Sequence, residues 1–592
     1  PEGGRLVERT RAQTFSFNGR EMRGFQGDTL ASALLGNGQM LVGRSFKYHR
    51  PRGIVTAGPE EPNALVNLGT AKTFEPNARA TTTELFDGLV AESQNHWPSL
   101  EYDVGAINAK LSRFLPAGFY YKMFMWPRAF WKHVYEPFIR QSAGLGKSPK
   151  NRDADLYEYF HITVDVLVVG GGIAGVTAAK AAAEAGAEVL LVEQTAHWGG
   201  RSVVDGAEID GRPAQDWIDE TVAALDAMPN VRLRTRSMGS GVYDHGYSLV
   251  YERMTDHSPD HSLPRHRLWK VRAGQIVSAT GAIERPLSFA GNDLPGVMLA
   301  GAVRDYVVDY AVAPGRKTVV VTNNDDGYRT ALVLKEAGLE VPLIVDARDH
   351  STGPLAEAAR EAGLRVANGR GIAKVAGQGK VQKVYVCDQK GTGEANEEIE
   401  ADCVAMSGGW SPVVHLWSHC GGKLIWDADE AFFRPDPTRA PTGAKGEAFV
   451  HTAGCASGSL SVSDVLSDAH SAGKAAAKAV GKNGKTSAAP SAEAEERQPI
   501  APVWNMPENA TYELKAKSWL DYQNDVKVTD VELAAREGFE SVEHTKRYTT
   551  LGMATDQGKL SNINGLAILA GQLGEDIPKV GTTTFRPPYT PI

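Results

Sequence analysis

The sequence predicts an α/β protein built around parallel β-structure, and three observations predict it. The run 164–169 is apolar except for Asp165 and is rich in valine, which is typical of a buried parallel strand. A glycine-rich turn, 170–175, follows directly, and the small residues of 176–185 then suit a helix. A second run, 317–321, begins another strand–turn–helix pattern. We therefore expect an α/β body with two βαβ units between residues 161 and 480.

Length and composition bound the remaining possibilities. The 592 residues exceed what one core holds, so several domains are expected. A net charge of −8 gives no reason to expect nucleic acid or an anionic membrane as a partner. No apolar run reaches the ~18 residues of a membrane helix, and the charged start, 1–11, is unlike a signal peptide. We expect a cytoplasmic protein.

The first segment, 1–110, is expected to be a small β-rich domain. Gln13–Phe17 alternates in polarity, Asn18-Gly19 is typical of a hairpin turn, and Thr29–Leu35 suits a short helix. The cationic stretch Lys47–Arg52 has two interpretations that the sequence leaves open. It is either a solvated basic turn or a contact with a phosphate or a partner near a cofactor.

An aromatic arm, 111–160, follows. It is expected to pack over a neighbouring domain or to form a subunit contact, and we slightly favour the contact because aromatic residues concentrate at interface centres. Trp126-Pro127 should interrupt any single helix. Between residues 111 and 145 the aromatic residues are Phe114, Phe119, Tyr120, Tyr121, Phe124, Trp126, Phe130, Trp131, Tyr135 and Phe138.

The last part of the chain divides into a linker and a compact segment. Residues 481–502 are poor in apolar side chains and are predicted to be a surface linker. Residues 503–592 are predicted to form a small α+β segment. In it, Asp530–Phe539 suits a helix with Thr529 as N-cap and Gly538 near its end.

Neither the cysteines nor the histidines form a recognisable catalytic or metal-binding pattern. Cys387, Cys403, Cys420 and Cys455 are single and widely spaced, so we interpret them as buried free thiols, and we expect no metal. His415, His419 and His451 are scattered near expected strand ends. The catalytic residues therefore stay unknown.

The turn 170–175 reads GxGxxG between its strand and its helix. Gly170 permits the tight turn, Gly172 lets a pyrophosphate approach the backbone, and Gly175 lets helix and strand pack closely. The free N–H groups at the helix start favour phosphate. Glu193 ends the next expected strand, 188–192, where a carboxylate accepts hydrogen bonds from an adenosine ribose. Together these features predict one bound dinucleotide.

Two further stretches resemble the two-dinucleotide flavoprotein superfamily typified by glutathione reductase. They are Gln275–Ala282 and Phe449–Ala456. In FAD-binding members an aspartate usually follows the glycine of the second stretch and holds the ribityl chain, whereas here Cys455 follows Gly454. This departure favours NAD over FAD. The candidate NAD-binding residues are Gly170, Gly172, Ala174, Gly175, Glu193, Gln194, Thr195, Gly200, Arg201, Gly239, Gly281, Gly454 and Ala456.

The second βαβ unit is expected to be a scaffold without a nucleotide. Its turn, 322–327, lacks the glycine triplet, and Asp325 and Asp326 are expected to cap the helix start. Two carboxylates there oppose a pyrophosphate. A disulfide reductase passes hydride from a second nucleotide to a CxxC pair. This chain is expected to have neither, so we do not expect disulfide reductase activity.

Three stretches make a resemblance specific: Gly43–Gly53, Phe119–Pro127 and Arg547–Lys559. All three resemble the α subunit of heterotetrameric sarcosine oxidase, and the likeness covers nearly the whole chain. The resemblance implies a glutathione-reductase-like two-Rossmann domain, with tightly bound NAD, behind an N-terminal ferredoxin-like domain. Since no cysteine precedes Cys387, that domain is expected to lack an iron–sulfur cluster.

The resemblance also implies partners. An N-methyl amino acid, such as sarcosine, is oxidised at FAD in a β subunit, and electrons pass through an FMN, covalently held by β at the α/β interface, to oxygen, giving hydrogen peroxide. Small γ and δ subunits complete the complex. Longer α subunits continue into an aminomethyltransferase-like domain that uses tetrahydrofolate, and this chain stops near its start, at 586–592. That domain is truncated, separate or absent.

The third stretch also supplies the FMN candidates. Cations beside hydroxyl groups suit a phosphate, although composition alone favours a solvated loop. The family segment lies near FMN, so the resemblance assigns to FMN, or to the surface that seals it, Lys546, Arg547, Thr549, Thr550 and Gln557.

Two other functions remain open. One is a stand-alone FAD-dependent dehydrogenase of dimethylglycine or another secondary or tertiary amine, which predicts a yellow isolated chain. The other is a non-catalytic NAD-binding scaffold, which predicts that NAD is needed only for folding.

Overall fold

The structure is a computed structural model that describes residues 3–142, 146–553 and 556–590. It divides the chain into two compact units. Unit 1 combines Pro1–Ala154, Glu284–Gly409 and Gln498–Thr583, and unit 2 combines Asp155–Ile283, Trp410–Arg497 and Thr584–Ile592. Residues 284–409 thus group with the N-terminal and C-terminal segments, so the range expected as one body, 161–480, contributes to both units.

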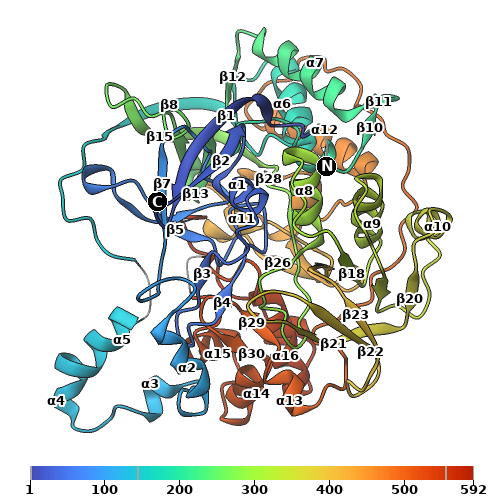
Figure 1. Ribbon diagram of the computed structural model, residues 1–592. Helices are drawn as coiled ribbons and strands as arrows, with labels where there is room; N and C mark the ends of the chain where they lie inside the picture. Colours follow the sequence, from blue (N-terminus) through green and yellow to red (C-terminus); the bar gives the residue numbers. More distant parts are fainter. Residues whose placement is uncertain (1–2, 143–145, 554–555, 591–592) are drawn as a thin grey trace. The chain divides into compact units, whose positions relative to one another are not determined.

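Unit 2 is built on a sheet with strand order β12-β9-β8-β15-β14-β13, and β28 extends it beside β15 (Figure 1). β12, β9, β8, β15 and β28 run parallel, and β14 and β13 are antiparallel to their neighbours. The strands are β8 (Leu156–Val169), β9 (Val189–Val192), β12 (Val231–Arg234), β13 (Ser237–Tyr243), β14 (Tyr247–Arg253), β15 (Pro264–Ser278) and β28 (Val450–Thr452).

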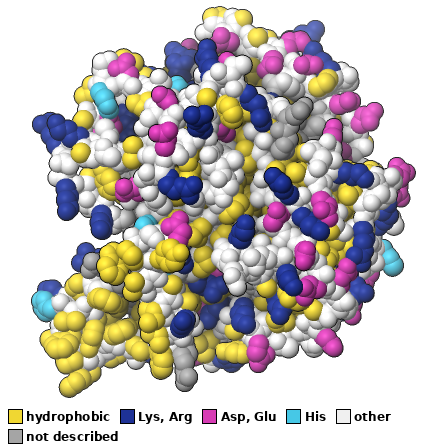
Figure 2. Space-filling view, in the orientation of Figure 1, with side chains coloured by type: hydrophobic (Ala, Val, Ile, Leu, Met, Phe, Trp, Pro, Cys, Tyr) yellow, Lys and Arg dark blue, Asp and Glu magenta, His cyan; other side chains and the backbone are white. Residues whose placement is uncertain are grey.

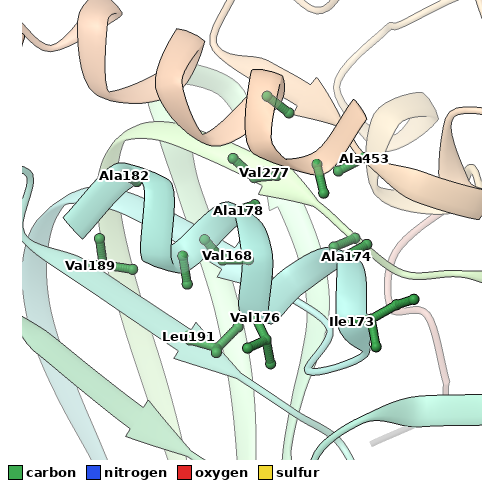
Figure 3. Packing of buried hydrophobic residues seen from close by; sticks show 14 of the residues in the cluster. Val168, Ile173, Ala174, Val176, Ala178, Ala182, Val189, Leu191, Val277 and Ala453 are labelled. Atoms are coloured by element: carbon green, nitrogen blue, oxygen red, sulfur yellow. The ribbon is translucent and has the colours of Figure 1, made fainter. Parts of the chain in front are cut away.

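Helices of unit 2 pack through small residues. α6 (Ile173–Glu184) is buried along alanine, glycine and valine positions, where it packs against the sheet and against α12 (Val462–Ala479) (Figure 3). A Cβ on Gly473 would lie 2.2 Å from the Ala178 carbonyl oxygen, so glycine lets α12 approach α6. The other elements are α7 (Ala214–Asp226), α11 (His415–His419), β10 (Glu208–Ile209), β11 (Arg212–Pro213), β25 (Trp410–Pro412), β26 (Leu424–Asp427) and β27 (Phe432–Pro435).

Unit 1 begins with the expected β-rich domain, whose sheet has the order β2-β1-β7-β5-β6. The hairpin turn is confirmed at Asn18-Gly19, where both φ values are positive. The expected helix is also confirmed as α1, with Thr29 as N-cap. The elements are β1 (Glu8–Phe17), β2 (Arg20–Gln26), α1 (Leu30–Gly36), β3 (Gly43–Arg44), β4 (Pro51–Arg52), β5 (Leu65–Leu68), β6 (Glu75–Arg79) and β7 (Leu89–Ser93).

The helix α2 (Ile107–Lys110) precedes the aromatic arm, which forms short helical turns: α3 (Phe119–Lys122), α4 (Arg128–Phe130), a π turn (Trp131–Tyr135) and α5 (Glu136–Ser142). Its last residues, 156–160, begin β8. The break expected at Trp126-Pro127 is confirmed, since α3 and α4 lie on either side of it. The side chain of Tyr120 and residues 143–145 lie outside the described part.

The middle of unit 1 is a parallel sheet, β17-β24-β18-β19-β20, beside an antiparallel sheet, β21-β22-β23. The expected strand at 317–321 is β18. The elements are β17 (Val297–Leu299), α8 (Ala300–Tyr310), β18 (Thr318–Thr322), α9 (Asp326–Glu336), β19 (Ile344–Asp346), α10 (Pro354–Glu361), β20 (Val366–Asn368), β21 (Arg370–Ala376), β22 (Lys383–Asp388), β23 (Ala395–Glu400) and β24 (Cys403–Ser407).

The C-terminal part of unit 1 is mostly helical: α13 (Tyr512–Lys515), β29 (Trp519–Asp521), β30 (Val526–Lys527), α14 (Val528–Arg536), α15 (Val542–Thr549), α16 (Asn562–Leu573) and α17 (Ile577–Val580). The N-cap expected at Thr529 is wrong. The helix begins at Val528, and the Asp530 carboxylate accepts a hydrogen bond from the Lys527 N–H. The expected end near Gly538, with φ of +87°, is confirmed.

The cationic stretch 47–52 is tied into unit 1 by buried ion pairs. Arg50 and Arg52 both bind the carboxylate of Asp293, and Arg52 also binds Asp525 at 2.6 Å. Arg52 is 1% exposed, and Asp293 and Asp525 are fully enclosed. The two arginines are therefore neither a solvated turn nor a free phosphate site. They join three distant segments of the chain.

The four cysteines are free thiols, as expected. Cys387 and Cys403 are buried, whereas Cys420 and Cys455 are partly exposed. Burial raises the pKa of Cys387 and of Cys455 to about 11, so both thiols are protonated at neutral pH.

Candidate functional site

The first candidate site is the turn between β8 and α6 in unit 2. Gly170 has φ of +106°, and a Cβ there would lie 2.3 Å from the Ala279 carbonyl oxygen. A Cβ on Gly175 would lie 1.7 Å from the Gly170 carbonyl oxygen. The fold itself therefore requires these two glycines, the first for the turn and the second for close packing.

Gly172 differs from its two neighbours. It is the N-cap of α6 with φ of −68°, which any residue adopts, and the nearest atom to a Cβ there would be Gly200 Cα at 4.0 Å. Packing therefore does not require glycine at this position. The backbone is bare at the amino end of a twelve-residue helix, where N–H groups and the helix dipole favour an anion.

The carboxylate of Glu193 faces this turn. Its Oε2 accepts a hydrogen bond from the Gly171 N–H at 2.7 Å, and its Oε1 accepts one from the Thr195 N–H at 2.8 Å. The residue is 7% exposed, and burial raises its pKa while the two hydrogen bonds oppose the rise. The interpretation as a surface acid is thus excluded.

The residues after Glu193 also contact the turn 170–175. The Gly199 N–H donates to the Gly171 carbonyl at 2.8 Å, and Gly200, with φ of +57°, would place a Cβ 3.2 Å from Gly172 Cα. Arg201 binds Asp205 at 3.2 Å and lies 5.1 Å from the centre of the Trp410 ring. The Gln194 carbonyl accepts a hydrogen bond from Arg253 at 3.0 Å.

The remaining candidates come from more distant segments of unit 2. A Cβ on Gly454 would lie 2.7 Å from Ala174 Cβ, and one on Gly239 would lie 2.4 Å from a Val169 methyl group. Ala456 is buried in the turn that Gly454 begins, and Gly281, with φ of +73°, has open space beside it. The structure thus brings the segments at 169–175, 193–200, 239 and 454 together.

Sequence reasoning missed one carboxylate in this region. Asp468, on α12, accepts hydrogen bonds from the Gly454 N–H at 2.7 Å and from the Ser457 hydroxyl at 2.5 Å. It fixes the turn that contains Cys455. Nothing in the sequence marks it, because it lies on a helix, fourteen positions after the glycine that it binds.

The histidines of unit 2 fit structural roles. His451 is bonded to the Gln275 side chain at 3.0 Å, and burial lowers its pKa. His415 packs against Phe585 and Tyr589, with ring centres 4.4 and 5.0 Å away.

The second βαβ turn, in unit 1, is closed by protein groups. Asp325 occupies the N-cap position of α9 as expected, but it makes no side-chain capping hydrogen bond; it binds Arg348 at 2.8 Å, and Asp326 binds Arg304 at 3.0 Å. Instead, the Asn324 side chain accepts a hydrogen bond from the Asp326 N–H at 2.9 Å. The segment 498–501 crosses this turn.

Hydrogen bonds join that segment to the turn. The Gln498 N–H donates to the Asp325 carboxylate at 2.8 Å, and Asn323 exchanges two bonds with the backbone of Ala501, of 3.1 and 2.8 Å. The remainder of the predicted linker is mostly exposed and forms no helix or strand, as expected.

The FMN candidates lie on and after α15. Their segment is a helix followed by a turn, not a loop as composition suggested. Lys546 and the exposed Arg547 lie in the last helical turn, where cations also compensate the helix dipole. Thr549 donates its hydroxyl to the Thr545 carbonyl at 2.8 Å, and Thr550 donates to the Thr549 carbonyl at 2.5 Å.

The remaining part of that motif is a turn with unusual backbone geometry. Thr550 and Gln557 have φ of +67° and +54°, and Gly552 and Gly558 are also positive. Within the motif, Ala554 and Thr555 lie outside the described residues.

The base of the aromatic arm rests on α15. A Cβ on Gly118 would lie 2.1 Å from the Tyr548 ring, and Tyr121 stacks on the same ring with centres 6.1 Å apart. The Gly118 N–H donates to the Tyr548 carbonyl at 3.1 Å, and Lys122 forms an ion pair with Glu537. Two of the stretches that carry the resemblance therefore meet here.

Three family models match parts of the chain. Residues 10–96 match the 2Fe-2S iron-sulfur cluster binding domain, residues 164–428 match the pyridine nucleotide-disulphide oxidoreductases, and residues 515–592 match the sarcosine oxidase A3 domain. The first of these ranges contains no cysteine.

Curated relatives match nearly the whole chain. The sarcosine oxidase α subunit of Rhizobium meliloti (strain 1021) is 46% identical over 99% of this chain and 58% of its own length. That of Corynebacterium sp. (strain P-1) is 37% identical over 99% of this chain and 56% of its own length. The chain therefore spans a little over half the length of these relatives.

Among solved structures, L-proline dehydrogenase from P. horikoshii is similar over 99% of this chain and 97% of its own, with a TM-score of 0.68 and 19% identity. This likeness supports the fold alone. No helix within the described residues has the length and apolar character to cross a membrane.

Proposed function

Because this chain belongs to the family of sarcosine oxidase α subunits, we propose that it is the nucleotide-binding part of a sarcosine oxidase. In this proposal the enzyme oxidises an N-methyl amino acid with oxygen, and the reaction occurs at FAD in a partner β subunit. Bound flavin supplies the two-electron oxidation. The present chain binds NAD, contributes to an FMN site at the subunit interface and holds the complex together. Tetrahydrofolate enters only if a folate domain is present elsewhere.

The observation that carries the NAD assignment is the pairing of Gly172 with Glu193. Gly172 leaves the backbone at the helix start uncovered, although packing does not require glycine there. Two backbone N–H groups hold the Glu193 carboxylate beside it. These groups suit a pyrophosphate and an adenosine ribose. Cys455, a protonated thiol, stands where an aspartate holds the ribityl chain in FAD-binding members.

The direct test is acid extraction of the purified chain, followed by chromatography of the released nucleotide. We expect NAD in near-stoichiometric amount. Release of FAD, with a yellow protein, would support the stand-alone dehydrogenase instead. The non-catalytic scaffold would be supported by two results together: the chain unfolds when NAD is removed, and oxidase activity is unchanged once the folded chain is reconstituted with its partners.

We assign Lys546, Arg547, Thr549, Thr550 and Gln557 to FMN or to the surface that seals it. What supports this is the exposed Arg547 with the half-buried Lys546 beside it, next to a turn with several positive φ values. Because both threonine hydroxyls bond to the helix backbone, the cations are the phosphate-binding groups in this proposal.

The FMN test uses the chain co-expressed with the β subunit. Arg547→Ala should lower FMN content, or slow electron transfer between the flavins, because a charge-assisted contact is worth about 1.5–3 kcal/mol. Arg536→Ala, which removes a cation from the last turn of α14, is the matched control. Full FMN content with the parental transfer rate in Arg547→Ala would make α15 structural.

The aromatic arm is proposed as a subunit contact with the β, γ or δ subunits. Figure 2 shows apolar side chains gathered at the lower left, where Figure 1 places α3, α4 and α5. Trp126 is 83% exposed and Phe138 is 71% exposed, and an apolar surface of this size favours a partner. The other exposed members are Tyr121, Met125, Phe130, Trp131 and Val134.

Trp126→Ser combined with Phe138→Ser tests the arm. The isolated chain should keep its melting temperature, since both side chains are exposed, while its assembly with the partner subunits weakens about tenfold or more. Tyr512→Ser, an exposed aromatic residue on α13, is the control. Undiminished assembly of the double variant on a sizing column would contradict this role.

The N-terminal domain is proposed to carry no cluster, because the matched range 10–96 has no thiolate to bind iron. Assays of iron and acid-labile sulfide on the purified chain test this. Stoichiometric iron would contradict it.

A further inference from the structure

The first half of β8 has a free edge. β15 pairs with β8 from Tyr157 to Val169, whereas β9 pairs only with Val166–Val169. In the part of the chain that the structure describes, no strand pairs with residues 156–164 on the β9 side. β8 (Leu156–Val169) is therefore about twice as long as the strand 164–169 that precedes the nucleotide-binding turn.

The direction of the backbone groups along this edge follows from one hydrogen bond. The Val166 N–H donates to the Glu188 carbonyl at 3.0 Å, on the β9 side. Because successive residues of a strand point their backbone groups to opposite sides, the N–H and C=O groups of Glu158, Phe160 and Ile162 point the same way. A row of such groups is a template for pairing with another strand.

The side chains along the edge are large and exposed. Tyr159 is 67% exposed and Phe160 is 45% exposed, and these two lie on opposite faces of the strand. Tyr157 is 53% exposed on the face of Tyr159. A long edge with exposed aromatic residues on both faces invites association, and native proteins usually cover such an edge.

One face of this strand is also cationic. Lys270 extends from β15 over the Tyr159 ring, with its Nζ 4.4 Å from the ring centre, and Arg272 lies 4.8 Å from the Tyr247 ring on β14. Within the described residues, neither cation forms an ion pair with a carboxylate. Lys270 therefore places an unneutralised charge beside the free edge.

We propose that the free edge of β8 binds an extended segment of a partner subunit as an added β-strand, with acidic side chains on the face of Tyr159 and Lys270. The inference rests on the proposed function, which supplies the partner. The backbone of the added segment would pair with the free N–H and C=O groups of β8, and its acidic side chains would neutralise the cations on this face. A second copy of this chain is disfavoured, because pairing through this edge would bring two cationic faces together.

Amide hydrogen exchange on the chain, alone and in complex with co-expressed β, γ and δ subunits, tests the pairing. An added strand protects the outward amides of Phe160 and Ile162 on assembly, while those of Tyr159 and His161 are already bonded to β15. Alternating new protection supports the proposal. Absence of any complex would contradict the proposed function and this inference with it, whereas a complex in which the outward amides still exchange freely contradicts this inference alone.

A pair of variants at one position separates the amide from the side chain. Phe160→Pro removes an outward N–H, which an edge strand tolerates, and Phe160→Ala removes only the aromatic ring. With equal melting temperatures for the two isolated variants, Phe160→Pro should assemble about five- to tenfold more weakly than Phe160→Ala. Equal assembly of the two variants would overturn the added strand. Lys270→Glu should weaken assembly further, and an unchanged salt dependence would contradict the acidic segment.

Discussion

At the scale of single residues, the turn after β8 contains glycines of two kinds. Gly175 is fixed by the fold, because any Cβ would collide with the Gly170 carbonyl, whereas Gly172 has room for one. The residue identity at position 172 therefore points to something outside the chain. The GxGxxG pattern predicts this difference, and the room for a Cβ at each position supports it.

Gly172→Ala and Gly175→Ala should therefore fail in different ways. We expect Gly172→Ala to stay within about 1 kcal/mol of the parent in stability and to lose bound nucleotide. Gly175→Ala should lose about 1–3 kcal/mol, because backbone must move. Denaturant titration and nucleotide extraction check both. Normal nucleotide content in a stable Gly172→Ala protein would contradict the site.

Lys559 gives unit 1 a pH-dependent stability. Burial, together with Arg79, lowers its pKa to about 7, well below the value of about 10.4 expected in the unfolded chain. The folded protein therefore binds fewer protons between these values, and stability rises with pH across them. Lys559→Met should be more stable than the parent at pH 7, and the difference should shrink towards pH 10. Melting temperatures at both pH values measure this, and a constant difference would contradict it.

At the scale of elements, helix packing determines whether a glycine stabilises or destabilises the protein. Gly473 on α12 touches the backbone of α6, whereas Gly571 on α16 is exposed with open space around it. Gly473→Ala should cost about 1–3 kcal/mol, since α12 must move away. Gly571→Ala should gain up to about 1 kcal/mol from helix propensity. Calorimetry of the two variants tests the contrast, and shifts of the same sign would contradict the packing argument.

Local patterns predicted local elements well. The glycine turn, α6, α1 and the Asn18-Gly19 hairpin all follow from signals within a few residues. The helix α15 was missed because its charged composition suggested a loop, although Ser541 caps it by accepting from the His544 N–H. The free half of β8 was missed because its residues, exposed on both faces, lack a buried pattern.

Contacts between distant positions could not be predicted. Asp293 lies 241 residues from Arg52, and Gln498 lies 173 residues from Asp325. No pattern in one sequence marks such pairs, so Lys47–Arg52 remained ambiguous until the ion pairs were seen. The same holds for Asp468, whose role depends on where α12 packs.

At the scale of the whole molecule, buried ion pairs join the three segments of unit 1. Asp293→Asn keeps the shape but leaves Arg50 and Arg52 without that carboxylate, and breaking a buried pair costs about 3–5 kcal/mol. We expect a lower denaturation midpoint for unit 1 as a whole. Asp349→Asn, which removes an exposed partner of Lys390, should leave the midpoint unchanged. Equal midpoints for the two variants would contradict the role of Asp293.

The interleaved order of the two units constrains how the chain is made. Unit 1 takes its last piece from Gln498–Thr583, and unit 2 takes its last piece from Thr584–Ile592. A nascent chain leaving the ribosome has therefore exposed the full βαβ pattern of unit 2, and both sheets of the middle region, long before either unit can close. Chaperone binding during synthesis, and fragments cut at residues 283 or 409 that aggregate rather than fold, are the expected consequences.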